Sequence, residues 1–148
     1  MTIDQTYRVN LTNWDTMFLN MALEAATVSK DPSTKVACLL VSPDRRRLSL
    51  GINGYPTSMT LPPEKWEDRE FKRKTVIHAE EHALLNAKTD TSNWTAYFTH
   101  CPCIKCATLL IDQNISLVIF KHPIKPEYQP ELALNLLAEH RVLVGLAS

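Results

Sequence analysis

The stretch TAYFTHCPCIKCATLLIDQNISLVIFKH, residues 95–122, decides the fold class. Two short runs rich in β-branched and aromatic residues, 95–100 and 116–122, predict strands. Between them, residues 103–113 predict a helix, with Pro102 at its start, where a missing N–H does no harm. A strand, a helix and a strand in this order indicate two parallel strands joined by the helix.

The flanking segments extend the same sheet. On the carboxyl side a helix is expected at 130–140, and the run 141–146 can close the sheet. Before residue 95 we expect a helix at 13–30, ended by Pro32, and then a hairpin of strands at 35–42 and 48–53. An irregular segment at 54–74, which can become helical from Glu64, leads to a helix at 79–87. We therefore expect an α/β fold in three layers, α/β/α, around a five-stranded mixed sheet, with one domain spanning residues 1–148.

Length and composition place the chain among single-domain globular proteins. It has 148 residues, of which 45% are hydrophobic and 22% charged, and its formal net charge is zero. Zero charge gives no global basic field for nucleic acid, and two basic clusters, 45–47 and 69–74, are expected to be solvent-exposed. We find no signal peptide and no apolar run long enough for a membrane span. A cytoplasmic protein without a stable nucleic-acid or membrane partner is therefore expected.

Three of the four cysteines crowd into CPCIKC, residues 101–106, which indicates a metal or redox site in a chain without a secretion signal. Cys103 and Cys106 are three positions apart, so on the first turn of a helix their sulfurs face the same side. A helix amino terminus also favours thiolates. His78 precedes the neighbouring helix, and one nitrogen with two sulfurs makes three ligands of a tetrahedral zinc ion. The open fourth position indicates a catalytic metal.

Glu80 follows His78 by two positions and supplies a carboxylate beside the three metal ligands. A carboxylate there is close enough to exchange protons with a zinc-bound water, and poorly placed to bind the same ion together with His78. The pattern H-x-E followed by P-C-x-x-C is the signature of zinc deaminases, in which water attacks C4 of cytosine or C6 of adenine. The sequence therefore predicts Zn²⁺ as cofactor and Glu80 as proton shuttle.

Three alternatives use the same residues differently. HAEEH also fits H-x-x-E-H, with His78 and His82 as zinc ligands and Glu81 as the base of a metalloprotease, which leaves the cysteine cluster without a role. A structural zinc, with Cys101 or His82 as fourth ligand, would make a zinc-stabilised binding protein. A thioredoxin-like pair of cysteines would leave His78 and its neighbouring carboxylates unused.

Beyond the zinc motifs, the chain resembles the cytidine deaminase-like superfamily from about residue 14 to residue 144, and more narrowly the deoxycytidylate (dCMP) deaminases. Five stretches carry the resemblance: SKDPSTKVACLLV at 29–41, GINGYP at 51–56, PEKW at 63–66, HAE at 78–80 and PCIKC at 102–106. The last two are shared by all branches, whereas DPST and GINGYP favour the dCMP branch. The resemblance implies hydrolytic deamination of dCMP to dUMP in pyrimidine deoxynucleotide metabolism.

The resemblance also implies roles for single residues. His78, Cys103 and Cys106 would bind zinc, and Glu80 would be the catalytic proton shuttle. Asn53 would hydrogen-bond the nucleoside, followed by a glycine that gives a tight turn the backbone freedom it needs.

Contacts to the rest of the nucleotide are expected from the residues around these positions. The backbone of Ala79 would meet the base carbonyl, and Lys30, Ser33 and Lys35 are the candidates for binding the 5′-phosphate. The family resemblance further implies a homo-oligomer, often a hexamer. The apolar helix at 132–137 could serve an interface, although a place in the core is the safer prediction.

Several positions depart from the family pattern. His82 stands where most members have Asn, and Cys101 where Ser or Glu is usual. TSMTLP at 57–62 replaces the Arg-Gly and acidic residues of regulated members, which puts control by dCTP and dTTP in doubt. These differences leave open another deaminase substrate: dCTP, a modified dCMP, free cytidine or tRNA adenosine.

Overall fold

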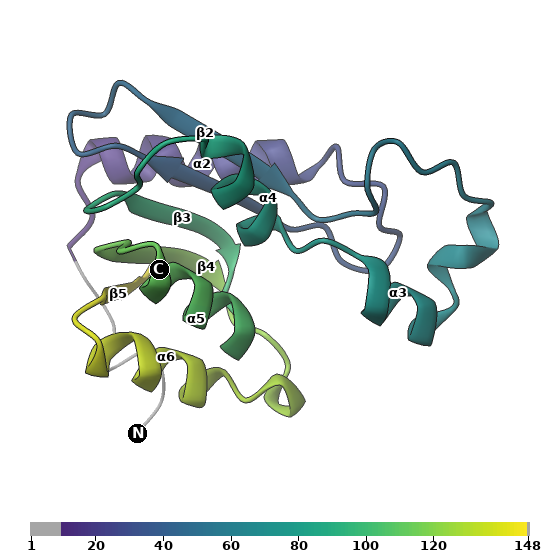
Figure 1. Cartoon of the computed structure of the whole chain (residues 1–148). Helices are drawn as coiled ribbons and strands as arrows, with labels where there is room; N and C mark the ends of the chain where they lie inside the picture. Colours follow the sequence, from purple (N-terminus) through teal and green to yellow (C-terminus); the bar gives the residue numbers. More distant parts are fainter. Residues whose placement is uncertain (1–9, 148) are drawn as a thin grey trace.

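A five-stranded mixed sheet forms the centre of the protein, whose computed structural model describes residues 10–147. The strand order is β2-β1-β3-β4-β5. The strands are β1 (Ala37–Val41), β2 (Leu48–Ile52), β3 (Thr95–His100), β4 (Leu117–His122) and β5 (Leu143–Leu146). Strand β1 pairs antiparallel with β2 and β3, while β3, β4 and β5 are parallel to one another. The predicted mixed sheet, with its hairpin and its parallel half, is confirmed (Figure 1).

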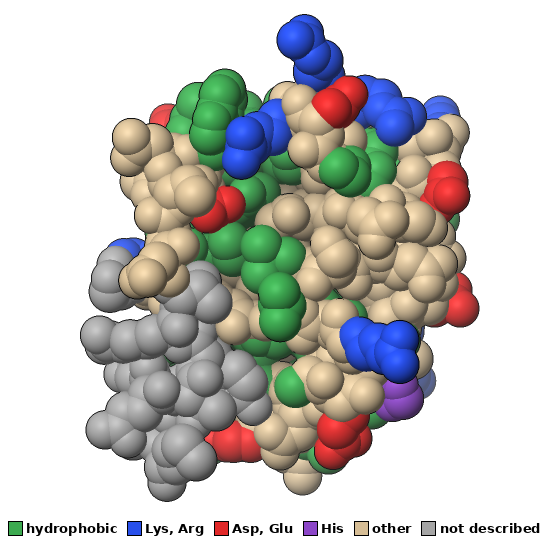
Figure 2. Space-filling view, turned by 90° about the vertical axis from the view of Figure 1, so that its left-hand side faces the viewer, with side chains coloured by type: hydrophobic (Ala, Val, Ile, Leu, Met, Phe, Trp, Pro, Cys, Tyr) green, Lys and Arg blue, Asp and Glu red, His purple; other side chains and the backbone are tan. Residues whose placement is uncertain are grey.

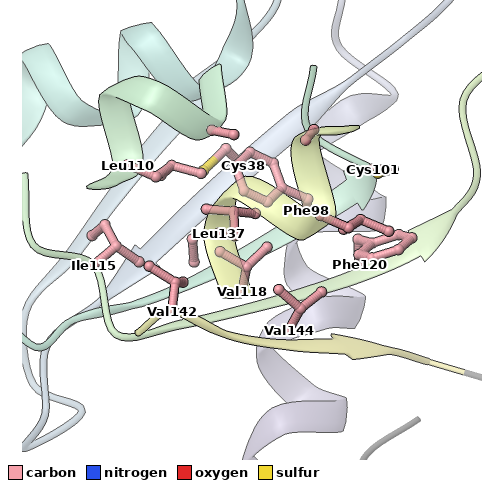
Figure 3. Packing of buried hydrophobic residues seen from close by; sticks show 14 of the residues in the cluster. Cys38, Phe98, Cys101, Leu110, Ile115, Val118, Phe120, Leu137, Val142 and Val144 are labelled. Atoms are coloured by element: carbon pink, nitrogen blue, oxygen red, sulfur yellow. The ribbon is translucent and has the colours of Figure 1, made fainter. Parts of the chain in front are cut away.

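Helices cover the two faces of the sheet unequally. The α-helices are α2 (Asn13–Ala26), α3 (Arg69–Thr75), α4 (Ala79–Ala87), α5 (Ile104–Asp112) and α6 (Pro130–Glu139). On one face Phe18 and Leu19 of α2 pack against Tyr97 and Ile119 of the strands. On the other face α4, α5 and α6 pack over the larger hydrophobic core, part of which is shown in Figure 3. The expected three-layer α/β/α arrangement is therefore confirmed.

The two antiparallel strands differ in burial because of their positions. Every residue of β1 is buried, since α2 lies on one side of it and α4 on the other. Strand β2 is at the edge, and its burial alternates: Leu48 and Leu50 are exposed, whereas Ser49 and Gly51 are buried toward α4. This alternation is typical of a strand with one covered face.

Helix α2 ends four residues earlier than the sequence predicts. Thr12 and Asp15 form a capping box at its start, but the helix stops at Ala26 rather than at Lys30. Beyond it, the Ser29 hydroxyl donates to the side chain of Asn53 at 2.8 Å, which ties residues 27–36 to the end of β2. Pro32 therefore lies past a terminus that tertiary hydrogen bonds have already set.

Gly51, not Gly54, is the glycine that the fold requires. A Cβ atom on Gly51 would lie 1.9 Å from the carbonyl oxygen of Ala79 and 2.4 Å from the backbone nitrogen of Ala83, because α4 packs directly on β2. A Cβ on Gly54 would meet nothing within 4 Å, and its φ is not positive. The backbone freedom expected after Asn53 is therefore not used.

We expect Gly51→Ala to lower the free energy of unfolding by about 3 kcal/mol, because α4 must move away from the sheet. Gly54→Ala should change it by less than about 1 kcal/mol, since the added methyl group meets no atom there. Urea unfolding of both variants measures the difference. Equal destabilisation by the two substitutions would contradict the close packing of α4 on β2.

The segment 55–75, which we call the arm, has a small aromatic cluster of its own. It contains a 3₁₀ turn, η1 (Pro63–Trp66), and α3, neither of which has a buried residue. The rings of Tyr55 and Trp66 are 4.5 Å apart, and those of Tyr55 and Phe71 are 5.6 Å apart. In Figure 1 α3 lies beyond the end of the sheet, apart from the layers. The helix allowed from Glu64 is thus split into two short pieces.

The charged surface, the last helix and the lengths of the helices complete the fold. On the face in Figure 2, most of the basic side chains lie along the upper edge, whereas the acidic side chains are scattered. In α6, Leu134 and Leu137 are fully buried and Leu132 is exposed, so the helix belongs mainly to the core. A second 3₁₀ turn, η2 (Pro126–Tyr128), precedes it. Along residues 10–147, none of the helices combines the length and the apolar character that crossing a bilayer requires.

Candidate active site

The site lies where α4 and α5 begin. His78 is the N-cap residue of α4 and Cys103 is that of α5, while Cys106 is on the first turn of α5. An isolated antiparallel bridge joins Gly54 to Ile77 and positions the residue before α4. The structure therefore brings together residues that are 25 positions apart in the chain.

The distances within this group match the geometry of a zinc ion. The Nδ1 atom of His78 is 3.6 Å from the Cys103 sulfur and 3.3 Å from the Cys106 sulfur. A tetrahedral ion with Zn–N of about 2.0 Å and Zn–S of about 2.3 Å separates such ligands by about 3.5 Å. One ligand atom from each of His78, Glu80, Cys103 and Cys106 lies within 4.8 Å of the others. The donor set therefore fits zinc, and Nδ1 is the imidazole nitrogen that faces the sulfurs.

Hydrogen bonds within the group shift the pKa values of both cysteines and of His78. The pKa of Cys103 is lowered to about 4, first by a hydrogen bond from the Cys106 thiol and then by His78, although burial opposes the shift. The same hydrogen bond, together with burial, raises the pKa of Cys106. The pKa of His78 is raised, mainly by its hydrogen bond with Cys103. The lowered pKa of Cys103 favours its thiolate, which is the form of cysteine that binds a divalent ion.

Glu80 is a buried carboxyl group inside the same cluster. Its side chain is enclosed at the start of α4, and burial raises its pKa, while a hydrogen bond from Cys106 and the charge of His78 oppose the shift. A carboxyl group with a raised pKa can both take up and release a proton near neutral pH.

The residues of the rival metal sites point elsewhere. His82 donates from Nδ1 to the backbone oxygen of Ile52 at 2.7 Å, with the ring in the tautomer that protonates this nitrogen. The Cys101 thiol faces the backbone oxygen of Pro102, and the Glu81 carboxylate accepts a long hydrogen bond from the backbone of His78. Within residues 10–147 neither His82 nor Cys101 belongs to the group that could hold a metal. The protease alternative therefore lacks His82 as its second ligand, and the structural-zinc alternative lacks its fourth ligand.

Asn53 lies next to the site, with its side chain fully hydrogen-bonded. Because Gly54 bridges to Ile77 in the antiparallel sense, Asn53 lies opposite His78. Its Oδ1 accepts from the Ser29 hydroxyl at 2.8 Å and from the Val36 backbone at 2.9 Å. Its Nδ2 donates to the Thr34 backbone oxygen at 2.9 Å and to an Asp31 oxygen at 3.3 Å. These bonds use the whole capacity of an amide side chain.

The other predicted binding residues are found in two environments. Ala79 is buried at the first position of α4, between His78 and Glu80. Lys35 donates to the backbone oxygens of Thr27 and Ser29, so its ammonium group caps the end of α2.

Lys30 is exposed, and Ser33 donates from its backbone and its hydroxyl to Asp31. The structure therefore places Ser33 beside a carboxylate and leaves Lys30 at the surface.

Sequence reasoning missed two charged residues beside Asn53. Asp31 is buried, and its Oδ2 is 2.7 Å from the ammonium group of Lys72 on α3. The basic cluster 69–74 is predicted to be solvent-exposed, and for Lys72 this prediction is wrong. Lys72 pairs with the buried Asp31, which is 41 positions earlier in the chain. A lone aspartate in DPST and a lysine among basic residues carry no signal of this pairing.

Comparisons with known proteins agree with this geometry. The family model for the "Cytidine and deoxycytidylate deaminase zinc-binding region" matches residues 12–122. An "Uncharacterized deaminase in luxG 3'region" of Aliivibrio fischeri is 37% identical over 108 residues, which cover 73% of this chain and 72% of that protein. A "Probable deoxycytidylate deaminase" of Caenorhabditis elegans is 38% identical over 107 residues, covering 70% and 54%. The "Deoxycytidylate deaminase" of Homo sapiens is 32% identical over 113 residues, covering 72% and 64%.

Among solved structures, the dCMP deaminase of cyanophage S-TIM5 in complex with dCMP and dUMP has the same fold. Its TM-score to this chain is 0.75 at 17% sequence identity, and the match covers 93% of this chain and 100% of that one. The matched part of this chain corresponds to little more than half of the worm protein and about two thirds of the human one.

Proposed function

The chain belongs to the cytidine and deoxycytidylate deaminase family, and from this premise we propose that it catalyses the zinc-dependent hydrolytic deamination of dCMP to dUMP. The observation that carries the proposal is the convergence of one imidazole, two cysteine sulfurs and a buried carboxyl group. A probable deoxycytidylate deaminase at 38% identity and a deoxycytidylate deaminase at 32% identity support the choice of substrate.

The metal would be bound by His78, Cys103 and Cys106, because these donors have the chemistry and the spacing that zinc requires. Bound zinc would supply a water whose pKa is lowered to about 7. Three protein ligands would leave a coordination position for that water, as in other catalytic zinc sites.

Glu80 would carry the protons of the reaction. It would take a proton from the attacking water and deliver it to N3 of the cytosine ring as the oxygen bonds to C4. It would then move the proton of the new hydroxyl group to the amino group, which leaves as ammonia while C4 becomes the carbonyl carbon of uracil. Its raised pKa suits both directions of transfer.

Substrate would be oriented from both sides of the bridge between Gly54 and Ile77. The free backbone N–H of Ala79 would donate to the base carbonyl, and Asn53 would donate to a sugar hydroxyl. Of the residues suggested for the phosphate, the exposed Lys30 remains a candidate, whereas Lys35 would first have to leave the end of α2 and the Ser33 hydroxyl would first have to leave Asp31.

A direct assay of substrate choice tests the proposal. With zinc content measured on the same preparation, ammonia release is followed from dCMP, dCTP, a modified dCMP, cytidine and a tRNA anticodon stem-loop. We expect kcat/KM for dCMP to exceed that for cytidine by about 100-fold or more, because a site that binds the 5′-phosphate rejects a substrate lacking this group. The values for dCTP and the modified dCMP show which cytosine nucleotide the site prefers. Inactivity on every nucleotide at full zinc content would favour the binding-protein alternative.

We further propose a homo-oligomer in the cytoplasm. Large hydrophobic side chains are exposed on α2 and on the edge strand β2, and such surfaces mark interaction sites. They are Trp14, Met17, Met21, Leu48 and Leu50. Light scattering on the same preparation should give a mass above that of one chain, and fluorescence of a tagged chain in cells tests the location.

A further inference from the structure

One carboxylate oxygen is shared between the arm and the proposed substrate-binding amide. Oδ2 of Asp31 accepts from the Lys72 ammonium group at 2.7 Å and from Nδ2 of Asn53 at 3.3 Å. Its other oxygen, Oδ1, accepts from the backbones of Ser33 and Thr34 and from the Ser33 hydroxyl. The Asp31 side chain is only 2% exposed and that of Lys72 only 22% exposed, so this pair is screened little by solvent.

Asp31 is ionised at neutral pH. Burial alone would raise its pKa, but the hydrogen bonds from Lys72, Ser33 and Thr34 lower it below its ordinary value. A buried carboxylate needs a partner for each oxygen, because an unpaired charge is costly.

Asn53 cannot bind a substrate without giving up a bond it already makes. Both lone pairs of Oδ1 and both hydrogens of Nδ2 are in use. The longest of these bonds is the one from Nδ2 to Asp31, at 3.3 Å. A sugar hydroxyl that accepts from Nδ2 would therefore replace Asp31 at the lowest cost.

We propose that Lys72 is a positioning residue, which keeps Asp31 paired so that the Nδ2 hydrogen of Asn53 is released to the sugar of the nucleotide. With Lys72 present, Oδ2 of Asp31 retains a short charged partner when Asn53 turns to substrate. Without Lys72, Asn53 becomes the sole side-chain donor to this oxygen, and its release leaves Oδ2 of the buried carboxylate without a donor. The inference rests on the proposed function, because it gives Asn53 the role of binding the substrate sugar.

The same pair links the arm to the site. Lys72 is on α3, which buries none of its residues, and it also donates to the Ser33 hydroxyl at 3.1 Å. The arm is thereby attached to residues 31–33, next to Asn53. Any movement of α3 that withdraws Lys72 would strengthen the hold of Asp31 on Asn53 and weaken substrate binding.

The experiment compares Lys72→Met with Lys74→Met in the zinc-loaded enzyme. Lys74 is on the same helix and also pairs with a carboxylate, that of Glu70 at 2.9 Å, but its side chain is 71% exposed. We expect Lys72→Met to raise KM for dCMP about 10-fold with kcat nearly unchanged, and Lys74→Met to change neither. Lys72→Arg should keep KM within about 3-fold of the original, because a guanidinium can also pair with Asp31. If Lys72→Met does not fold, Lys72→Gln keeps a hydrogen bond without the charge and should raise KM by a smaller factor.

Two further measurements separate positioning from other roles. In an Asn53→Ala background, Lys72→Met should have no additional effect on KM, because the residue through which it acts is gone. If Lys72 instead bound the 5′-phosphate, Lys72→Met would weaken dCMP but not deoxycytidine, whereas positioning predicts the same factor for both. Additive effects in the double variant, or a loss confined to dCMP, would overturn the inference.

Failure of the proposed function gives a different pattern. An enzyme that does not deaminate dCMP, or whose KM is unchanged by Asn53→Ala, would contradict the assigned substrate or the role of Asn53. An enzyme that is active on dCMP and sensitive to Asn53→Ala, but equally tolerant of Lys72→Met and Lys74→Met, would contradict only the role of Lys72.

Discussion

Glu80→Gln is expected to lower kcat for dCMP by about 10⁴-fold while the protein keeps its zinc. The amide has the size of the carboxyl group it replaces, so the packing at the start of α4 is preserved, but it cannot take up or deliver a proton. Glu80 is buried beside Cys106 and His78, and no other carboxylate belongs to this group among residues 10–147. Steady-state ammonia release and the zinc content of the purified variant measure the two halves of the expectation.

Glu81→Gln is the matched control, because it makes the same change one residue away. The Glu81 carboxylate accepts from the backbone of His78 at 3.5 Å, and a glutamine oxygen can accept the same bond, so the substitution should change stability by less than about 1 kcal/mol and have little effect on activity. A large loss of kcat in Glu81→Gln, together with an active Glu80→Gln, would reverse the assignment and favour the H-x-x-E-H alternative.

Cys106→Ser is expected to weaken zinc binding by about 10²–10³-fold and to abolish turnover at low zinc concentration. Zinc-finger peptides bind zinc through four ligands with about 10–16 kcal/mol, so one ligand contributes about 2.5–4 kcal/mol. Cys106 is fully buried with its sulfur 3.3 Å from the imidazole, and a serine hydroxyl is a poor substitute for a thiolate. Competition with a chromophoric chelator measures the affinity, and a fixed-zinc assay measures turnover.

Cys101→Ser is the control for Cys106→Ser, since it alters another buried thiol, five positions earlier in the sequence. Cys101 faces a backbone carbonyl and is not part of the donor group, so its replacement should leave the zinc affinity within about 3-fold. Equal loss of zinc in the two variants would mean that the fourth coordination position is filled by Cys101 and that the metal is structural.

The elements predicted from sequence are accurate where a local pattern determines them. The helix at 79–87 and the strand at 95–100 have the bounds that the structure shows. The predicted end of α2 lies four residues too late, and the helix allowed from Glu64 is in fact a 3₁₀ turn followed by a separate short helix. Both depend on hydrogen bonds and ring contacts between residues far apart in the chain, which no periodicity records.

The same distinction applies to the site. Cys103 and Cys106 at the start of one helix form a local pattern, and so do His78 and Glu80 at the start of another. The structure brings all four residues together. The engagement of Asn53 by four protein groups is not local, since its partners come from residues 29–36. Sequence could suggest that Asn53 binds a nucleoside, but not that a hydrogen bond must first be exchanged.

Along the chain, β3 lies between the metal-binding residue at the start of α4 and those at the start of α5, so the ligands are synthesised at different times. On the ribosome, His78 is made 25 positions before Cys103, an interval of about 1–5 seconds at ordinary elongation rates. A nascent chain cannot capture the metal until α5 has emerged from the exit tunnel and β3 has joined the sheet. Scarcity of zinc would therefore act only after α5 has been made, and added metal could not rescue products truncated before residue 103.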